Sequence, residues 1–321
     1  MKNIHSCAII IAGASGDLAR RKLIPALDSL YKQGKICNDI AVIGTGRSDF
    51  TNEQFRSNFA ISDDFANHLH YYKNTAGIKQ FIESLGQFSK IIVFLSLPPS
   101  AYAASAKEFA DERFEQKVSI VIEKPFGYDY ASAKLLNSQL AGYYDESQIF
   151  RIDHYLAKEA VQNIMVFRYG NTVFNPVWNS HYVESIQINA IEKLTIVERA
   201  GYFDKSGIIR DMVQNHLLQL LALLTMEAPV TLDPHDVKIQ KVSLLKSIKI
   251  EEIHRYQYDT YREENGVDPE STTETFAELR LSINNMRWAG VPVYIRTGKA
   301  VHRKGTEIGV RFKAPPKVLF N

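Results

Sequence analysis

Short apolar runs alternate with helical repeats along the first half of the chain. Apolar stretches that stop at glycine or proline are typical of buried parallel strands. We expect such strands at 4–12, 40–44, 91–97, 118–122 and 148–152. Apolar residues recur at helical spacing between them and predict helices over 16–32, 101–114 and 131–143. This alternation predicts an α/β fold, a Rossmann-type doubly wound parallel sheet.

The second half has a different pattern. In 183–191, Ile186, Ile188 and Ala190 fall on one face, as in a strand with one buried side. Further strand-like segments at 276–283, 291–295 and 308–312 are joined by turn residues. Residues 208–226 are apolar nearly all round in their second half and predict a buried helix. We therefore expect an α+β domain with a largely antiparallel sheet and helices on one face.

The predicted organisation is a nucleotide-binding domain over 1–152 and a substrate-binding and catalytic domain over 153–321. The 321 residues are enough for two cores. Lys and Arg number 38 against 36 Asp and Glu, a balance without the electrostatic footprint of a nucleic-acid or membrane binder.

The two cysteines, Cys7 and Cys37, lie in no metal-type spacing, and a chain of this size needs no disulfide. The apolar runs are too short to span a bilayer, and the amino terminus lacks a signal-peptide pattern. We therefore expect reduced thiols in a cytoplasmic protein. Apart from His154 and His216, the histidines, including His68, His70 and His235, show no ligand spacing with Cys or carboxylates, so no metal site is expected.

A glycine-rich turn follows the first predicted strand and opens the first helix. Gly13 permits a tight turn, and Gly16 lets a pyrophosphate approach the helix amino terminus. The spacing departs from the strict G-x-G-x-x-G pattern, and an ordinary strand-to-helix turn explains it equally well. Arg47 and Ser48 follow the second strand and offer the donors that a 2′-phosphate needs, which favours NADP. Asp49 lies next to them and leaves NAD open.

The run Arg151-Ile-Asp-His-Tyr-Leu-Ala-Lys-Glu159 is the most charged candidate site. Such groups are costly to bury without partners. Asp153 and His154 could support proton transfer, and His154, Tyr155 and Lys158 could hold an anion, so the run suggests a phosphorylated substrate. The alternative is a buried ion pair tying the two domains together. Glu123-Lys-Pro-Phe-Gly127 follows another strand, and a cis or a trans Lys124-Pro125 bond would fit there.

Six segments together resemble the glucose-6-phosphate dehydrogenase family, in family order over nearly the whole chain. They are Gly13–Ala19 with Lys22-Leu23, Glu123–Gly127, Arg151–Glu159, Gly201–Asp204, Gly207–His216 and Arg296–Lys299. The resemblance implies that His216 is the general base for the C1 hydroxyl and that Asp153 is its carboxylate partner. It also implies two sets of ligand contacts. Substrate contacts are Lys22, Lys124, His154, Tyr155, Lys158, Glu192, Asp211, Lys299 and Lys304; cofactor contacts are Gly13, Ser15, Gly16, Asp17, Leu18, Arg47 and Lys124.

The implied chemistry is physically consistent. Oxidising a cyclic hemiacetal to a lactone removes the C1 hydroxyl proton as hydride leaves C1. A neutral histidine, with an ordinary pKa of about 6.5, can accept that proton, and a carboxylate on its other nitrogen fixes the tautomer. Such acid–base help is worth about 10²–10⁴-fold in rate. Without the resemblance, His216 would fit an inert core histidine, and Lys299 and Lys304 a solvated basic hairpin.

Two departures from the family shape the expectations. Typical members are longer, so the interface of a homo-oligomer is expected to be incomplete in this chain. Ala157 stands where members usually have Gly, which is tolerable in a helical backbone and costly at positive φ. The leading hypothesis is an NADP-dependent dehydrogenase of D-glucose 6-phosphate. The alternatives are a dehydrogenase of an amino- or deoxy-hexose 6-phosphate and a non-catalytic NADP or sugar-phosphate binding protein.

Overall fold

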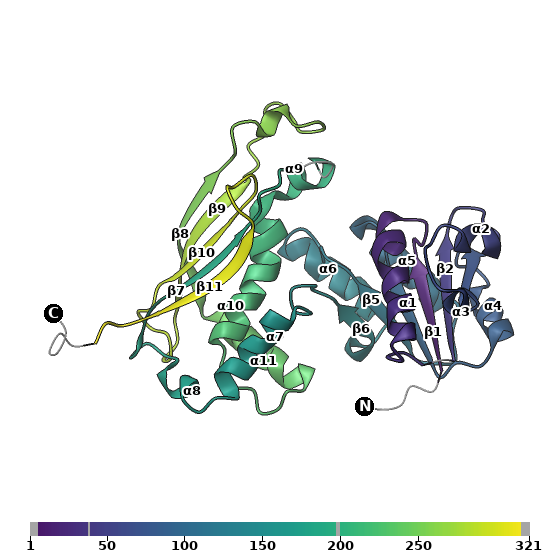
Figure 1. Cartoon of the computed structure of the whole chain (residues 1–321), viewed down its shortest axis with the longest axis horizontal. Coiled ribbons are helices and arrows are strands. Elements are labelled where there is room, and N and C mark those ends of the chain that lie inside the picture. Colours follow the sequence, from purple (N-terminus) through teal and green to yellow (C-terminus); the bar gives the residue numbers. More distant parts are fainter. Residues whose placement is uncertain (1–5, 38, 197–199, 316–321) are drawn as a thin grey trace. The chain divides into compact units, whose positions relative to one another are not determined.

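Two sheets organise the chain, one in each of two units, Met1–Ile152 and Asp153–Asn321 (Figure 1). This computed structural model describes residues 6–37, 39–196 and 200–315. Each unit has its own hydrophobic core.

The first unit contains a parallel sheet of six strands in the order β3-β2-β1-β4-β5-β6. The strands are β1 Cys7–Ala12, β2 Ile40–Gly46, β3 Leu69–Lys73, β4 Lys90–Leu95, β5 Val118–Ile122 and β6 Ile149–Arg151. The order reverses between β1 and β4, and ligands of such sheets bind at this switch point, beyond the carboxyl ends of the strands. The predicted doubly wound sheet is confirmed.

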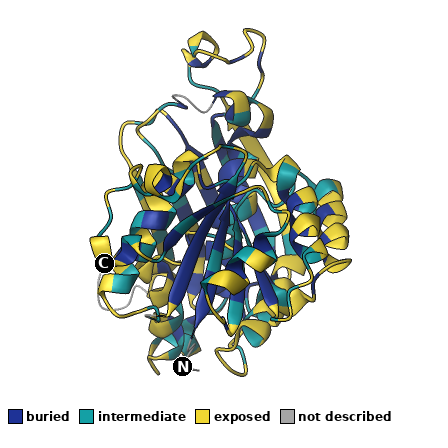
Figure 2. Ribbon diagram, turned by 90° about the vertical axis from the view of Figure 1, so that its right-hand side faces the viewer, coloured by how far each residue is buried: buried dark blue, intermediate teal, exposed yellow. Residues whose placement is uncertain are grey.

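Residues of β1 alternate between two cores. Ile10 packs with the cluster that includes α4 and α5 residues, whereas Ile11 packs in the cluster under α1, α2 and α3. Because helices cover both faces, the strands are dark blue and the outer turns of the helices yellow in Figure 2. This double burial explains why the strands appear in the sequence as continuous apolar runs. The helices are η1 Ala19–Leu23, α1 Ile24–Lys32, α2 Asn52–Arg56, α3 Asp63–Ala66, α4 Ile78–Leu85, η2 Pro99–Ala101, α5 Tyr102–Asp111, α6 Tyr130–Ala141 and η3 Glu146–Gln148.

The prediction missed β3 and the short helices around it. Only Leu69 and Tyr71 are buried in β3, so the sequence there shows no continuous apolar run. The predicted strand 4–12 begins at residues that lie outside the described ranges, and the observed β1 starts at Cys7.

The second unit contains a five-stranded sheet in the order β11-β7-β10-β9-β8. Only the β7–β10 pair is parallel, so the expected largely antiparallel sheet is confirmed. The strands are β7 Val183–Ile191, β8 Ile248–Tyr256, β9 Phe276–Ile283, β10 Val293–Gly298 and β11 Gly305–Phe312. The prediction missed β8, an edge strand in which every residue after Ile248 is exposed, so no apolar alternation marks it.

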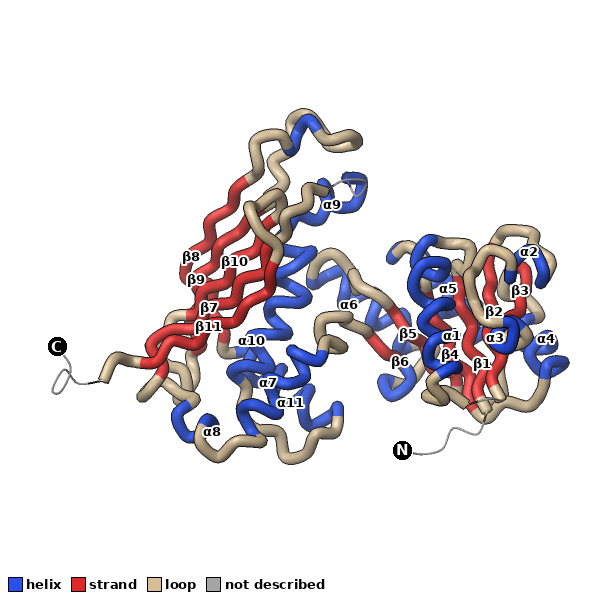
Figure 3. Tube along the Cα trace, in the orientation of Figure 1, coloured by secondary structure: helices blue, strands red, loops and turns tan. Residues whose placement is uncertain are grey.

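Helices α7, α10 and α11 lie along one face of this sheet (Figure 3). The predicted buried helix exists but is composite: η5, Ile209–Leu217, is wound as a π-helix, and α10, Leu218–Thr225, continues it. The remaining helices are α7 Glu159–Tyr169, α8 Phe174–Val177, α9 Ala200–Ile208, α11 Pro234–Lys246 and η6 Tyr261–Glu263. Throughout the described ranges, helices fall short of the length and apolarity that a bilayer crossing requires.

Buried side chains cap the carboxyl end of α10. Trp178 and Trp288 donate their indole N–H groups to the carbonyls of residues 224 and 225 at 2.8 and 2.7 Å. Arg168, which is fully buried, donates to the carbonyls of residues 223 and 226 at 2.7 and 2.8 Å. Helix-terminal carbonyls have no partner within the helix, so these donors fix the end of the segment that begins with η5.

Candidate active site

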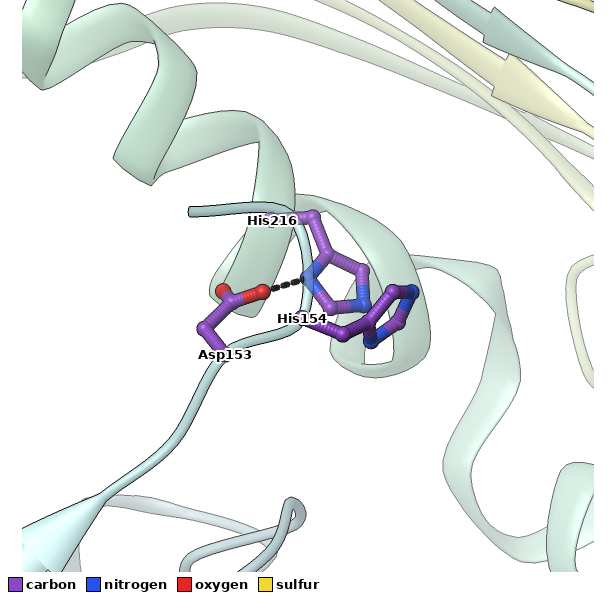
Figure 4. A group of neighbouring side chains, drawn as sticks. All are labelled: Asp153, His154 and His216. Carbon is purple, nitrogen blue, oxygen red and sulfur yellow. Dashed lines mark hydrogen bonds and ion pairs between the residues drawn. The ribbon is translucent and has the colours of Figure 1, made fainter. Parts of the chain in front are cut away.

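His216 and Asp153 form a hydrogen-bonded pair in the second unit. The His216 ring is fully buried on η5, and its Nδ1 lies 2.6 Å from Asp153 Oδ1 (Figure 4). The backbone N–H of Tyr155 donates to the same oxygen at 2.9 Å. Burial alone would raise the pKa of Asp153, but these two hydrogen bonds outweigh it and hold that pKa below its usual value. An ionised Asp153 keeps the proton on Nδ1, so the lone pair of the neutral ring is on Nε2.

The segment that follows Asp153 wraps its side chains around His216. The ring of Tyr155 stacks on the imidazole with centroids 4.1 Å apart and an interplanar angle of 16°. His154 meets the same imidazole edge-on at 4.5 Å. The ammonium nitrogen of Lys158 lies 3.4 Å from the Tyr155 ring centroid. The predicted proton-transfer and anion-binding residues are thus in mutual contact.

The topology of the sheet brings three more predicted residues to one edge. Glu192 follows β7 and Lys299 follows β10; these strands are parallel neighbours in register, so their carboxyl ends meet. Lys299 Nζ lies 2.5 Å from Glu192 Oε2, and the lysine is buried. Lys304 precedes β11, whose first residue pairs with the last residue of β7. Burial lowers the pKa of Lys158, and the positive charge of Lys304 lowers it further.

Asp211 lies on η5, five residues before His216, and is buried. A π-helix bonds residues five apart, so this winding stacks Asp211 and His216 on successive turns. Gly207, near the end of α9, has a φ of 73° and kinks the chain two residues before η5 begins. The Glu274 side chain accepts a hydrogen bond from the N–H of Ile209 at 3.2 Å, and its backbone carbonyl accepts from the N–H of Ile208 at 3.0 Å. Glu274 thereby caps the helix that carries the base.

A cavity of about 750 Å³ opens at the carboxyl ends of β1 and β2 in the first unit. Gly13 and Arg47 line it, as predicted for cofactor contacts. Gly13 has φ +81°, and a Cβ there would lie 2.3 Å from the Ser96 carbonyl oxygen, so only glycine fits. Ser15 and Gly16 belong to the adjoining turn, Asp17 and Leu18 to the start of the helix after it, and all four are outside the lining. Sequence reasoning missed Asn74 because β3, which it follows, was not predicted, and it missed Thr45 although that residue lies at the end of the predicted second strand; the end-of-strand rule would have found Thr45.

Asp49 lies outside the residues that line the cavity. Its carboxylate lies 2.8 Å from the Lys73 ammonium group. Lys22 lies in η1 and Lys124 follows β5, with a cis Lys124–Pro125 bond. Both lysines belong to the first unit, so their predicted contacts with a sugar stay predictions.

Sequence reasoning also missed Glu274 and Thr306. Burial raises the pKa of the Tyr155 phenol, and the neighbouring Thr306 side chain on β11 partly offsets that rise. Neither residue stands in a recognisable motif, so only spatial proximity identifies them.

Ala157 has no positive φ; among the described non-glycine residues Asn74, Arg113 and Ala300 do. The added methyl at Ala157 is therefore compatible with the backbone.

Asp153, His154 and His216 could also hold a metal ion, because one ligand atom from each lies within 4.8 Å of the others. Two imidazoles and a carboxylate suit Zn²⁺. Asp153 and His216 are already joined by a short hydrogen bond, and the cation of Lys158 lies on the neighbouring Tyr155 ring. The arrangement suits proton transfer, and the absence of a metal site stays a prediction.

Comparison with known proteins gives consistent matches along the chain. Residues 10–163 match the family model for the NAD binding domain of glucose-6-phosphate dehydrogenase, and residues 165–321 match that for its C-terminal domain. Glucose-6-phosphate 1-dehydrogenase of Bacillus subtilis (strain 168) is 39% identical over 352 residues, which cover 97% of this chain and 72% of that protein.

Solved structures agree with these matches. A glucose-6-phosphate dehydrogenase in complex with its substrate glucose-6-phosphate has a TM-score of 0.94 at 34% identity and covers 100% of this chain and 74% of that chain. Glucose-6-phosphate 1-dehydrogenase from Mycobacterium avium has a TM-score of 0.90 at 33% identity, with coverages of 98% and 73%.

Proposed function

The chain belongs to the glucose-6-phosphate dehydrogenase family, and we propose that it oxidises D-glucose 6-phosphate at C1 to 6-phosphoglucono-1,5-lactone with NADP as hydride acceptor. The dehydrogenase activity and the substrate are supported by curated relatives of that name and by a similar structure that holds glucose-6-phosphate. The observation that carries the proposal for the residues is the 2.6 Å hydrogen bond between buried His216 and Asp153.

His216 acts as the general base. As hydride leaves C1, the C1 hydroxyl proton moves to Nε2, and the ring becomes an imidazolium. Asp153, ionised and bonded to Nδ1, stabilises that charge. Because the ring is excluded from water, this carboxylate supplies stabilisation that solvent would otherwise provide.

The surrounding charges orient the sugar. His154, Tyr155, Lys158 and Lys304 would hold the phosphate, since a dianion needs several cationic or N–H donors placed away from the reacting carbon. Glu192, Asp211 and Lys299 would bind sugar hydroxyls; the Lys299–Glu192 ion pair keeps donor and acceptor side by side. Lys22 and Lys124 complete the proposed set from the first unit.

The cofactor would bind at the cavity of the first unit. NADP, when bound, accepts the hydride at its nicotinamide ring. Gly13 permits close backbone approach, and the Arg47 guanidinium suits a 2′-phosphate. The position of Asp49 outside the cavity lining, paired with Lys73, supports Arg47 as the residue that faces the ribose. A cytoplasmic location is part of the proposal, supported by two free thiols, Cys7 and Cys37.

A substrate and cofactor panel tests this proposal. The purified protein is incubated with glucose 6-phosphate or glucosamine 6-phosphate and with NADP or NAD, and absorbance of the reduced cofactor is followed from pH 6 to 9. We expect the highest kcat/KM with glucose 6-phosphate and NADP. Preference for glucosamine 6-phosphate would establish a different sugar substrate, and binding of both ligands without turnover would establish a binding protein.

The base is tested by His216→Asn, with His235→Asn as control on the exposed start of α11. We expect His216→Asn to abolish turnover while the dissociation constant for glucose 6-phosphate stays within severalfold. Retention of most of the rate would remove His216 from the role of base.

Light scattering on the same samples measures whether the protein is an oligomer.

A further inference from the structure

The phenol ring of Tyr155 lies between the base and a cation. The imidazole of His216 stacks on it nearly in parallel, with centroids 4.1 Å apart at 16°. The Lys158 ammonium nitrogen is 3.4 Å from the same ring centroid. A ring stacked in parallel covers its face, so the ammonium group must occupy the opposite face. His216 and Lys158 are thus separated by one aromatic ring.

The Tyr155 ring is held from several directions. The residue is buried, at 8% exposure, and Thr306 of β11 is a near neighbour of its phenol. Its backbone N–H donates to Asp153 Oδ1, the oxygen that also accepts from His216. His154 packs edge-on against both rings, at 5.1 Å from Tyr155 and 4.5 Å from His216. A ring fixed in this way determines the tilt of the imidazole it faces.

On the basis of the proposed function, we propose that Tyr155 is a positioning residue for the base His216. The Tyr155 ring orients the imidazole, stabilises the imidazolium formed on proton transfer, and keeps Lys158 on its opposite face. The face of an aromatic ring carries negative electrostatic potential and attracts a cation stacked on it. The neutral imidazole gains less from that face than the imidazolium does. The interaction therefore strengthens as the proton arrives, which is the condition for accelerating the step.

This role differs from that of a phosphate ligand. A phosphate contact would use the hydroxyl of Tyr155, whereas the proposed contact uses the ring. The two can be separated by substitution, since Tyr155→Phe removes only the hydroxyl and Tyr155→Leu removes the ring as well. Lys158→Met provides the complementary change, because it removes the cation from the opposite face.

Other charged groups surround Tyr155, Asp153 and Lys158 and must stay constant in the comparison. The charges of Glu192 and Asp211 interact with the Tyr155 phenol. Asp153 interacts with the charges of His154 and of Lys241 on α11. The positive charge of Lys304 lowers the pKa of Lys158. None of these residues is altered in the Phe and Leu variants, so a difference between those two variants reports the ring.

The test measures kcat, KM and the pH profile of kcat/KM for wild type, Tyr155→Phe and Tyr155→Leu. We expect Tyr155→Phe to keep kcat within about threefold and Tyr155→Leu to lose about threefold to thirtyfold, the range that ring–cation contacts span. The KM for glucose 6-phosphate should rise equally in both, since both lack the hydroxyl. The acid limb of the profile should move to lower pH in Tyr155→Leu, because the protonated base loses its support, and to higher pH in Lys158→Met. Equal kcat and an equal acid limb in the Phe and Leu variants would overturn the proposal.

A second measurement does not depend on turnover. The His216 ring is followed by NMR with histidine-labelled protein, its signal being assigned with His216→Asn. The midpoint of its titration should be lower in Tyr155→Leu than in Tyr155→Phe and higher in Lys158→Met. If the Leu variant fails to fold, an unchanged midpoint in Lys158→Met still overturns the proposal. If the wild type shows no turnover with glucose 6-phosphate, the proposed function fails, and these titrations decide the role of Tyr155 separately.

Discussion

Replacing Asp153 with Asn should cost far more activity than its small change in shape suggests. The amide oxygen can still accept the hydrogen bonds from His216 Nδ1 and the Tyr155 backbone, which are 2.6 and 2.9 Å long. The size of the side chain and the tautomer of the ring can therefore persist. What Asp153→Asn removes is the negative charge that faces the imidazolium.

The magnitude follows from the separation and burial of the pair. Two unit charges about 4 Å apart interact by about 4 kcal/mol at an effective dielectric constant of about 20. The pair belongs in this regime because the His216 side chain is 0% exposed and that of Asp153 is 15% exposed. A loss of that size from the transition state lowers kcat by about a thousandfold.

The assay compares kcat, KM and glucose 6-phosphate binding for wild type and Asp153→Asn at pH 7 to 9. Asp233→Asn is the matched control, an exposed aspartate that begins α11 without a side-chain cap. We expect kcat to fall by about 10³-fold with KM within severalfold, and circular dichroism to show that the variant is still folded at the assay temperature. A loss of less than about tenfold would refute the charge argument, and a rise in KM alone would assign Asp153 to substrate binding.

The pH dependence has a definite sign. The pKa of Asp153 is held below its usual value, so its contribution to stability is fully present above the unfolded pKa of about 3.9 and is lost as pH falls through the folded pKa. Asp153 therefore stays ionised throughout the assay range. If wild-type activity falls near pH 6, the protein should still be folded there, because Asp153 is not yet protonated. Circular dichroism at the same pH values measures whether the fold is retained.

Three further predictions concern the cofactor, the helix end and the helix start. Arg47→Ser should raise the KM for NADP by about 10- to 100-fold and leave that for NAD nearly unchanged, because only NADP carries the 2′-phosphate. Trp288→Phe should lower the free energy of unfolding in denaturant by about 1–3 kcal/mol, since it leaves the carbonyl of Thr225 without its 2.7 Å donor. Gly207→Ala should destabilise by at least about 1–2 kcal/mol and lower kcat, because φ is 73° and a Cβ would lie 2.4 Å from Glu274 Oε1.

Each of these has a control on the same chain. Gly201→Ala should be nearly neutral, since a Cβ at Gly201 meets nothing within 4 Å. Tyr128→Phe alters a ring that is 67% exposed and should leave unfolding unchanged. Equal stability of Gly207→Ala and Gly201→Ala would contradict the helix-start argument, and a parallel loss for NAD and NADP in Arg47→Ser would contradict the phosphate argument.

Periodicity identified the elements that are buried on one or both faces. The observed bounds of β5, β7 and β9 agree with the predicted 118–122, 183–191 and 276–283. Burial creates such patterns, because a strand between helices is apolar throughout and a strand with one wet face alternates. By the same reasoning β8 was missed, since both of its faces are exposed, as was β3, which buries too few residues to form a run.

The candidate site divides in a similar way. The residue types of the 151–159 run and the motif around His216 indicated proton transfer and anion binding before any contact was visible. Their joint presence could not show that Asp153 and His216 touch, because 62 residues of chain separate them. The parallel pairing of β7 and β10, which brings Glu192 to Lys299, leaves no sign in either segment.

The sequence by itself determined the two fold classes, the family and the chemical character of the site, because burial patterns and motifs are local properties of the chain. Only the tertiary structure decided which atoms face one another: Nδ1 of His216 against Asp153, the ring of Tyr155 between His216 and Lys158, and Glu274 at the helix start. Such contacts depend on packing between distant segments, and a packed interior fixes side-chain directions that composition leaves free.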